Sequence, residues 1–445
     1  MNAYLITDDT IRITLITICE YHPNLTVSIG QHTSALLQLE PIEPCKKRWD
    51  AIRRCTYAGH YGSTTLPKEA LDDVVRGKAT MFISYFNESH SRKGLRLIDS
   101  RVSSTRQPTN RLAVCVPPIA QFSGWPLLAR FFEMWIAHGA TKFYLLLQSI
   151  TPEVDAMLHI YESDPKISIE RVLWGLVPSP KNTSDDENPN NLLFRSELFL
   201  SINDCTLRAR GTAEYLALFD LDEIILLRNN LTLLQILDSA ITNDQNIAAF
   251  MFRSSYGIFS DDTRFVTHPS QIKFDSLRNV SLENWVHVAG SLGKLIVRPE
   301  RIKITGLHTF GVMANRKYKG FTIDPSTGQI FNLRLVEMPL KDGHVYESNT
   351  ELTKYIPQWS HSYQERMTSE RMRIEKGKSF MSGISFAQEE WPNPGHEATE
   401  QLERCILKYF SLNDTTCPAH VKCTPNITAV GMDQWIYSEQ TMVVV

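Results

Sequence analysis

The most constraining feature of this sequence is a regular alternation of buried strands and helices that begins at Arg111. "RLAVCVPP" reads as a short buried strand stopped by two prolines, and "SGWPLLARFFEMWIAHGA" as a helix with Ser123 at its N-cap and Gly139 near its C-terminal end. The pattern continues with a strand "TKFYLLLQ", a helix from Thr151 to Ser163, a strand "ISIERVLWG" and an amphipathic helix from Asn191 to Arg210. This alternation predicts an α/β fold with a parallel sheet covered on both faces and ligands at the carboxyl ends of its strands.

The next strand, "EYLALFDLDEIILL", is interrupted by three carboxylates, those of Asp220, Asp222 and Glu223. Carboxylates at the end of a buried strand repel one another unless a positive charge lies between them. If the segment is extended, Asp220 and Asp222 point to the same side, so that one cation meets both. Their hard oxygens suit Mg²⁺ or Mn²⁺, which such sites hold together with the phosphates of a substrate. The alternative is a solvated turn or a helix cap.

The pattern of predicted strands, helices and loops divides the chain into three parts. Residues 1–109 predict a β-rich accessory domain, ended by the proline- and serine-rich connection "DSRVSSTRQPTN". Residues 110–345 carry the α/β pattern, and residues 346–445 predict a helical extension with a cysteine-containing tail. At 445 residues the chain is long enough for two or three such units.

Composition narrows the class of partner and the compartment. The net charge of −3 argues against a nucleic-acid binder, which normally has a basic face. The cysteines are even in number and lack the spacing of a zinc site, and the chain has an excess of glycosylation sequons. Both observations favour an oxidising, glycosylating compartment. The sequons lie at Asn24, Asn87, Asn182, Asn230, Asn279, Asn413 and Asn426. No apolar run reaches the roughly 20 residues that span a bilayer, and the N-terminal "IRITLITICEY" predicts a strand.

Several spaced segments resemble one known family. "FFEMWIAHGATKFYLLLQ", "DCTLRARGTAEYLALFDLDEIILL" and "GKLIVRPERIKITGLHTF" are similar, in that order, to signature blocks of glycosyltransferase family 92, and "TMFISYFNESHSRKGLRLI" to a block upstream. The resemblance implies an inverting, Mn²⁺-dependent hexosyltransferase of GT-A (Rossmann-like) fold that uses a UDP-sugar, usually UDP-galactose. It places Asp220 and Asp222 on the family's DxD motif.

The resemblance also implies a cellular setting. Family members are usually Golgi type II membrane proteins that act on glycans or glycoproteins, including animal members that build galactose on the fucose of N-glycan cores. Membrane association is therefore expected from the family, although this chain shows no anchor.

Further site residues follow from this reading. Inversion needs a carboxylate near the acceptor as base, for which Asp262 and Glu283 are the candidates. Arg208, on the helix before the DxD motif, is a candidate for binding the donor's phosphate. His308, at the end of the third block, is the candidate third metal ligand, because imidazole is acceptable to Mn²⁺. A histidine bound by backbone at a strand end is the alternative for His308.

Several other polar and aromatic residues are expected to have a structural role and not a role in binding or catalysis. Glu133 and His138, on one helix, predict packing or capping at a helix end rather than a ligand pair. Tryptophans here are expected in the core rather than as sugar platforms, namely Trp125, Trp135, Trp174 and Trp285.

Two other classes of function remain open on the sequence. One is a metal-dependent phosphodiesterase that uses the same carboxylates to activate water, which generally requires further ligands. The other is a glycan-binding protein without catalytic activity.

Overall fold

The computed structural model describes most of the chain. It covers residues 2–439 apart from 31–32, 44–54, 89–90, 104, 106, 181, 260–261, 335–342, 376–383, 385–387 and 410–415. Within these residues, no helix combines the length and the apolar character needed to cross a membrane.

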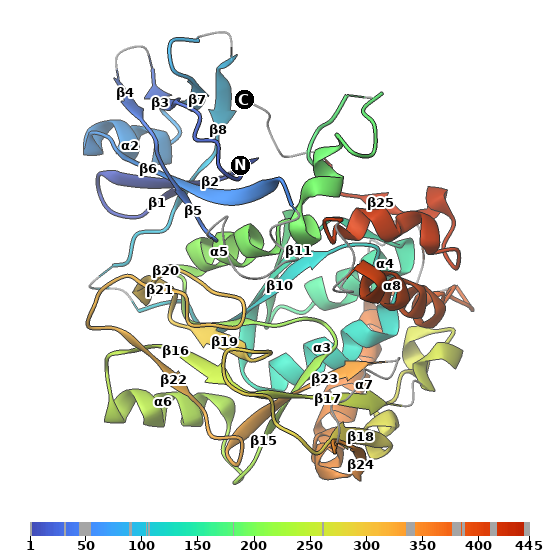
Figure 1. Cartoon of the computed structure of the whole chain (residues 1–445). Coiled ribbons are helices and arrows are strands. Elements are labelled where there is room, and N and C mark those ends of the chain that lie inside the picture. The colour runs from blue at the N-terminus through green and yellow to red at the C-terminus, as the bar shows by residue number, and fades with distance from the viewer. Residues whose placement is uncertain are drawn as a thin grey trace.

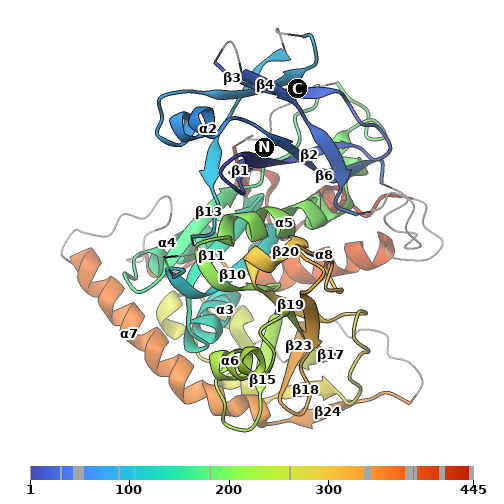
Figure 2. The same ribbon diagram turned by 90° about the vertical axis from the view of Figure 1, so that its left-hand side faces the viewer.

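Among its described residues, the N-terminal part consists of two small antiparallel-rich sheets and the helix α2. One sheet has the order β5-β6-β2-β1-β9 and the other β4-β3-β7-β8. The elements are β1 (Ala3–Leu5), β2 (Thr10–Ile18), β3 (Leu25–Ile29), β4 (Thr33–Leu36), β5 (Gln38–Pro41), β6 (Tyr57–Thr65), α2 (Lys68–Val75), β7 (Met81–Tyr85), β8 (Lys93–Leu95) and β9 (Leu97–Asp99). The predicted strand "IRITLITI" is β2, and the whole unit lies above the rest of the molecule in Figures 1 and 2.

The central sheet has the order β13-β11-β10-β14-β19-β16-β22. Its strands are β10 (Asn110–Ile119), β11 (Ala140–Leu147), β13 (Ser168–Leu173), β14 (Ala213–Leu218), β16 (Ile247–Phe252), β19 (Lys294–Val297) and β22 (Lys319–Thr322). The first four in this order are parallel, whereas β19 runs antiparallel to both of its neighbours. The predicted α/β class is confirmed, and the sheet is parallel over these four strands but mixed as a whole.

Both faces of this sheet are buried, as its apolar strands require. Along β10, Leu112, Val114 and Val116 enter one hydrophobic core, while Ala113 and Cys115 enter the other. The first core is covered by α3 (Trp125–Ala137), α4 (Pro152–Glu162), α6 (Leu233–Asn243) and α7 (Ile356–Glu375), and the second by α5 (Leu198–Ala209). Helix α5 lies between the central sheet and the N-terminal sheets (Figure 1).

A second five-stranded sheet, of order β15-β23-β17-β18-β24, adjoins the first. It contains β15 (Glu223–Leu227), β17 (Ser254–Phe259), β18 (Val280–Glu283), β23 (Gly328–Arg334) and β24 (Tyr346–Asn349). The run predicted as a single strand, 214–227, passes from the central sheet into this one, and so does the apolar run 247–259. The breaks lie at residues 219–222 and at Arg253, where polar residues interrupt the apolar sequence.

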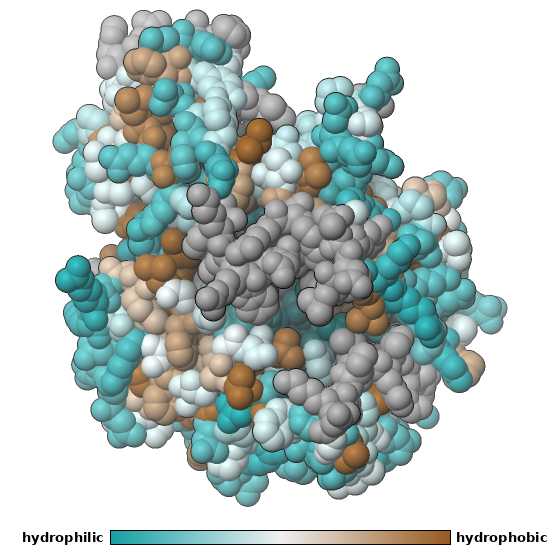
Figure 3. Space-filling view, in the orientation of Figure 1, coloured by the Kyte–Doolittle hydropathy of each residue, from teal (hydrophilic) through white to brown (hydrophobic). Residues whose placement is uncertain are grey.

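The C-terminal part forms a separate two-stranded sheet with a short strand that follows β11. Helix α8 (Gly395–Tyr409) is followed by a 3₁₀ segment, η9 (His420–Asn426), and by β25 (Ile436–Tyr437), which pairs with β12 (Ser149–Ile150). A short pair, β20 (Ile302–Ile304) and β21 (Val312–Met313), completes the fold. Three disulfides are described, Cys55–Cys417, Cys115–Cys205 and Cys405–Cys423, and two of them involve cysteines of the C-terminal part. On the face in Figure 3, hydrophilic residues predominate among those described.

Two local predictions about helices are wrong. Gly124, not Ser123, is the N-cap of α3, and no side chain caps it. The helix predicted from Asn191 starts only at Leu198, because Arg195, Ser196 and Glu197 have the left-handed φ values of 44°, 56° and 59°.

The packing prediction for Glu133 and His138 is confirmed. Glu133 accepts hydrogen bonds from Tyr161 and Arg366, and His138 is the buried C-cap of α3.

Candidate functional site

The DxD motif lies at the end of β14, in the connection that leads to β15. Asp220 Oδ2 is 2.6 Å from the ammonium of Lys294, the first residue of β19. Burial opposes ionisation of Asp220, but the charges of Lys294, Arg195 and Arg334 outweigh it and lower the pKa of this carboxyl. Asp220 is therefore a carboxylate at neutral pH.

Asp222 has a different cationic partner. Its Oδ2 is 3.1 Å from Arg334, at the end of β23, and its backbone oxygen accepts from the amide of Leu333. Residues 221–222 form a turn, so the two aspartates do not lie on one extended strand as predicted. They still share one cluster, because both raise the pKa of Arg334.

Glu223 is the buried member of the group. Its side chain is only 2% exposed, lies 3.3 Å from Lys294, and accepts a hydrogen bond from the amide of Asp220. Burial, reinforced by repulsion from Asp220 and Asp222, raises the pKa of Glu223 to about 8 despite the nearby Lys294. Glu223 is thus mostly neutral at pH 7 and holds the turn in place.

Arg195 completes the cluster from a strained segment. Burial lowers the pKa of its guanidinium to about 10, although the charges of Asp220 and Asp222 act in the opposite direction, so Arg195 stays charged at neutral pH. The left-handed conformation of residues 195–197 is held by bonds from Arg195 N to Pro418 O, from Trp174 Nε1 to Ser196 O and from Ser196 Oγ to Gln148. Three successive non-glycine residues in this region are costly, and such strain concentrates at functional sites.

Two histidines face the same cluster. His308 Nδ1 is bound to the carbonyl of Gly293 at 2.9 Å, and burial together with the charge of Lys294 lowers the pKa of His308 to about 4. Its imidazole is therefore neutral. His420, in the C-terminal tail, has its pKa lowered to about 3 by burial and by Arg195, and the charge of Asp220 also acts on it. The tail thus reaches the edge of the DxD cluster.

Glu283, at the end of β18, is surrounded by two imidazoles. Its side chain is 1% exposed, with Oε2 at 3.0 Å from His287 Nε2 and Oε1 at 3.2 Å from His344 Nδ1. The amide of Tyr256 also donates to it. Since both oxygens are occupied and buried, Glu283 does not face an acceptor directly. The other base candidate, Asp262, begins the 3₁₀ segment η4 (Asp262–Phe265), and its side chain lies outside the described residues.

The arginines of α5 contribute to structure rather than to this cluster. Arg208 binds Asp204 at 2.6 Å and Glu170 at 2.8 Å, whereas Arg210 donates to the carbonyls of Ile6 and Ser100 in the N-terminal part. The prediction that Arg208 binds the donor finds no support in these contacts. The cations beside the DxD motif are Lys294, Arg195 and Arg334.

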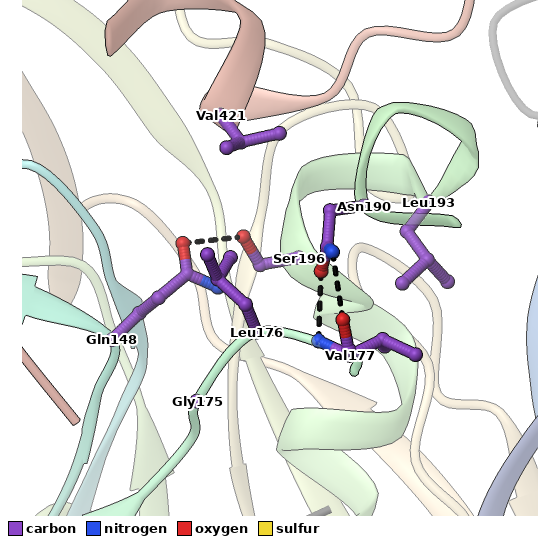
Figure 4. A pocket seen from close by; sticks show the side chains of 8 residues that line it. All are labelled: Gln148, Gly175, Leu176, Val177, Asn190, Leu193, Ser196 and Val421. Atoms are coloured by element: carbon purple, nitrogen blue, oxygen red, sulfur yellow. Dashed lines mark hydrogen bonds between the residues drawn. The ribbon is translucent and has the colours of Figure 1, made fainter. Parts of the chain in front are cut away.

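A small pocket lies at the carboxyl ends of β11 and β13, next to Arg195. It is lined by Gln148, Gly175, Leu176, Val177, Asn190, Leu193, Ser196 and Val421. Figure 4 shows Ser196 pointing to Gln148 and Asn190 bonded to both backbone groups of Val177. Val421 brings the C-terminal tail to its rim.

The donor atoms present fit a hard divalent cation. Asp220 and Asp222 are partly exposed, at 41% and 27%, and His308 is neutral with its Nδ1 committed to a carbonyl, an arrangement that leaves Nε2 for a metal. No three acidic, histidine or cysteine side chains gather as a ready-made metal cluster in the described part of the chain. Mn²⁺ and Mg²⁺ usually take one or two carboxylates and complete their shell with water and substrate phosphate.

Sequence reasoning missed the site's own cations. Lys294 stands in the quoted block "GKLIVRPERIKITGLHTF", but a lysine at the start of an apolar strand gives no signal of where its ammonium points. Arg195 was assigned to a helix, and His420 to a tail without an assigned role.

Comparisons with known proteins place the part of the chain that carries this site in a family. The family model for glycosyltransferase family 92 matches residues 110–379. A curated glycosyltransferase family 92 protein of Caenorhabditis elegans is 26% identical over 261 residues, which are 58% of this chain and 47% of that protein. The match thus spans about half the length of this relative.

Two solved structures were also found. HddC from Yersinia pseudotuberculosis has a TM-score of 0.22 and 13% identity, covering 58% of this chain and 99% of that one. A UDP-glucose pyrophosphorylase complexed with UDP-glucose has a TM-score of 0.22 and 9% identity, and the match covers 57% of this chain and 99% of that one. With such scores neither likeness carries an argument.

Proposed function

The chain belongs to glycosyltransferase family 92, and we propose that it transfers galactose from UDP-galactose to a glycan acceptor with inversion at the anomeric carbon. We also propose that residues 110–345 form a GT-A (Rossmann-like) domain. The parallel strands β13, β11, β10 and β14, with the DxD motif directly after β14, support this assignment.

The observation that carries the proposal is the charge balance at the DxD motif. Lys294, Arg195 and Arg334 stand against Asp220 and Asp222, with Glu403 as a further partner of Arg334 at 3.4 Å. With Glu223 mostly neutral, cations and carboxylates are balanced. A divalent cation alone, or a diphosphate alone, would unbalance the cluster, whereas the two together leave it neutral. The site therefore suits a metal and a diphosphate that bind as a pair.

Asp220, Asp222 and His308 are the residues that would hold Mn²⁺. When bound, the metal supplies Lewis-acid stabilisation of the negative charge on the leaving diphosphate. Lys294, Arg195 and Arg334 stabilise the same charge from fixed positions.

The acceptor hydroxyl must lose its proton as its oxygen attacks the sugar carbon and the diphosphate leaves with the bonding electrons. Glu283 is the base candidate with a described environment, and it would act through His287 or His344 because its own oxygens are buried. In this arrangement the carboxylate orients the imidazole, and the imidazole takes the proton.

We further propose the Golgi and secretory pathway as the compartment, with membrane association as in the family. The three described disulfides support it. The sequon asparagines other than Asn413, which lies outside the described residues, are all exposed, as glycosylation requires. A secreted preparation that shows no mobility change on deglycosylation would count against this compartment.

The experiment that tests the function is a screen of UDP-sugars with and without Mn²⁺, in which UDP release and sugar transfer to an N-glycan pool are both measured. Galactose transfer that requires Mn²⁺ supports the proposal. Release of phosphate from simple phosphodiesters instead would favour a hydrolase, and binding of glycans without turnover would favour a lectin-like protein.

A further inference from the structure

Trp285 is an exception among the tryptophans that the sequence assigns to the core. Trp125, Trp135 and Trp174 are buried as predicted, whereas Trp285 is 48% exposed, so the prediction is wrong at this position. A single exposed aromatic residue is ordinary on a protein surface. The surroundings of Trp285 are not.

The indole of Trp285 is held on a rigid support. Its ring stacks on His344 with centroids 4.9 Å apart and planes 19° from parallel, and His344 is in turn bound to the buried Glu283. One face of the indole is therefore covered, and the stacked imidazole that covers it is fixed by its contact with the buried Glu283. This leaves the other face for solvent or a ligand.

The backbone beneath the ring is fixed as well. Ser255 Oγ donates to the carbonyl of Trp285 at 2.6 Å. Arg253 donates to the carbonyls of Val286 and His287, both at 2.8 Å. Arg253 and Ser255 flank the start of β17, so the 285–287 segment is attached to a sheet rather than to a loop. A side chain held in this way loses little entropy when it binds a ligand.

The same sheet connects this platform to the DxD motif. Glu223 pairs with Asn332 on β23, Asn332 pairs with Tyr256 on β17, and the β17–β18 register continues from the Gly257–Leu282 pair to Glu283. Residues paired across strands carry their side chains on one face of the sheet. With about 4.8 Å between strands, Glu283 lies roughly 14 Å across the sheet from Glu223.

The side chains along these paired positions, from Glu223 to Glu283, change from a charged cluster at one end to aromatic rings at the other. At the DxD end the cluster suits a diphosphate and metal, and at the other end an exposed indole lies beside two imidazoles. Tyr256 connects the two ends, because its ring meets His287 at 5.2 Å and the charges of both Arg334 and Glu283 act on its hydroxyl.

From this geometry we propose that the exposed face of Trp285 is the subsite for the acceptor's pyranose ring, whose apolar C–H face stacks on the indole. The proposal rests on the transferase function and deepens it, by giving the acceptor a position across the sheet from the donor. Stacking buries apolar area on both partners, while the hydroxyls of the sugar ring stay at its edge, where they remain free to form hydrogen bonds. Trp285 is a positioning residue in this scheme.

The test is saturation-transfer NMR on the intact chain with Mn²⁺ and UDP, using methyl α-fucoside, methyl β-galactoside and an N-glycan core as probes. Trp285→Ala and Trp285→Leu should lose the sugar signal, which corresponds to at least about a tenfold weaker affinity. Trp285→Phe should keep most of it. Phe321→Ala removes an aromatic that is 42% exposed on β22, in the other sheet, and should bind as wild type.

UDP binding, followed separately, should be unchanged in every variant. In a transfer assay the alanine variant should raise the acceptor KM while kcat at saturating acceptor and the donor KM stay close to wild type. Sugar binding by a folded Trp285→Ala equal to wild type would overturn the subsite, and so would absence of sugar binding in the wild type. Sugar binding that depends on Trp285 in a chain that transfers no sugar would uphold the subsite and reject the transferase.

Discussion

Replacement of Lys294 by methionine tests the electrostatic account of the DxD cluster. Methionine preserves the length and apolar packing of the lysine stem, so the change mainly removes the ammonium. Lys294 is 5% exposed and binds Asp220 at 2.6 Å and the fully enclosed Glu223 at 3.3 Å. Removal of one partner from a buried pair costs about 3–5 kcal/mol, because the remaining charge is desolvated.

The expected loss for Lys294→Met lies below that range. Asp220 is 41% exposed, so water screens part of its charge. Glu223 can take up a proton, because its pKa is already raised to about 8 by burial and nearby carboxylates. We therefore expect a loss of about 2–3 kcal/mol at pH 8 and a smaller loss at pH 6, where Glu223 is more fully protonated.

The assay is urea unfolding of the disulfide-intact chain by tryptophan fluorescence at both pH values. Lys319→Met is the matched control, because Lys319 is 60% exposed and its pair with Asp244 should contribute no more than about 1 kcal/mol. A Lys294→Met variant as stable as the wild type at pH 8 would refute the reasoning. So would a loss that does not depend on pH.

Other predictions concern the remaining residues of the site. Glu223→Gln should flatten the pH dependence of the free energy of unfolding. In the wild type this carboxyl loses its proton near pH 4.5 when the chain is unfolded and near pH 8 when it is folded, so stability falls between these values by at most about 1.4 kcal/mol per pH unit. Equal slopes for variant and wild type in unfolding titrations would speak against this reasoning. His308→Ala should weaken Mn²⁺ affinity and donor binding together at pH 7, where the imidazole is neutral, and a Mn²⁺ titration by electron paramagnetic resonance that matches wild type would show a structural histidine. Glu283→Gln should lower kcat by about a hundredfold or more with unchanged UDP binding, and an unaffected kcat would remove Glu283 from the reaction.

The sequence predicts the central layer well because its signals there are strong and local. Strands β10, β11 and β14 of the parallel sheet contain long apolar runs that must be buried, although β10 continues through the two prolines that were expected to stop it. Sheet membership is not predictable in the same way. The run that contains Asp220 reads as one strand, yet it crosses into a second sheet, as does the run that contains Arg253. The apolar character of both halves is the same, and only tertiary pairing separates them.

The site shows the same limit. Asp220 and Asp222 were recognisable because carboxylates after a buried strand need a partner. The partners themselves come from distant positions, Lys294 on β19 and Arg334 on β23, and no local pattern marks them. Arg195 was missed for a different reason, since its segment has helical composition but a left-handed backbone held by the C-terminal tail.

The measurement that tests the central proposal most directly compares wild type with Asp222→Asn in galactose transfer from UDP-galactose to an N-glycan acceptor, with and without Mn²⁺. Asparagine keeps the shape of the side chain but removes one carboxylate from the proposed metal site. The account predicts Mn²⁺-dependent transfer by wild type and none by a folded Asp222→Asn. Transfer by that variant, or equal transfer by wild type without any divalent metal, would contradict it.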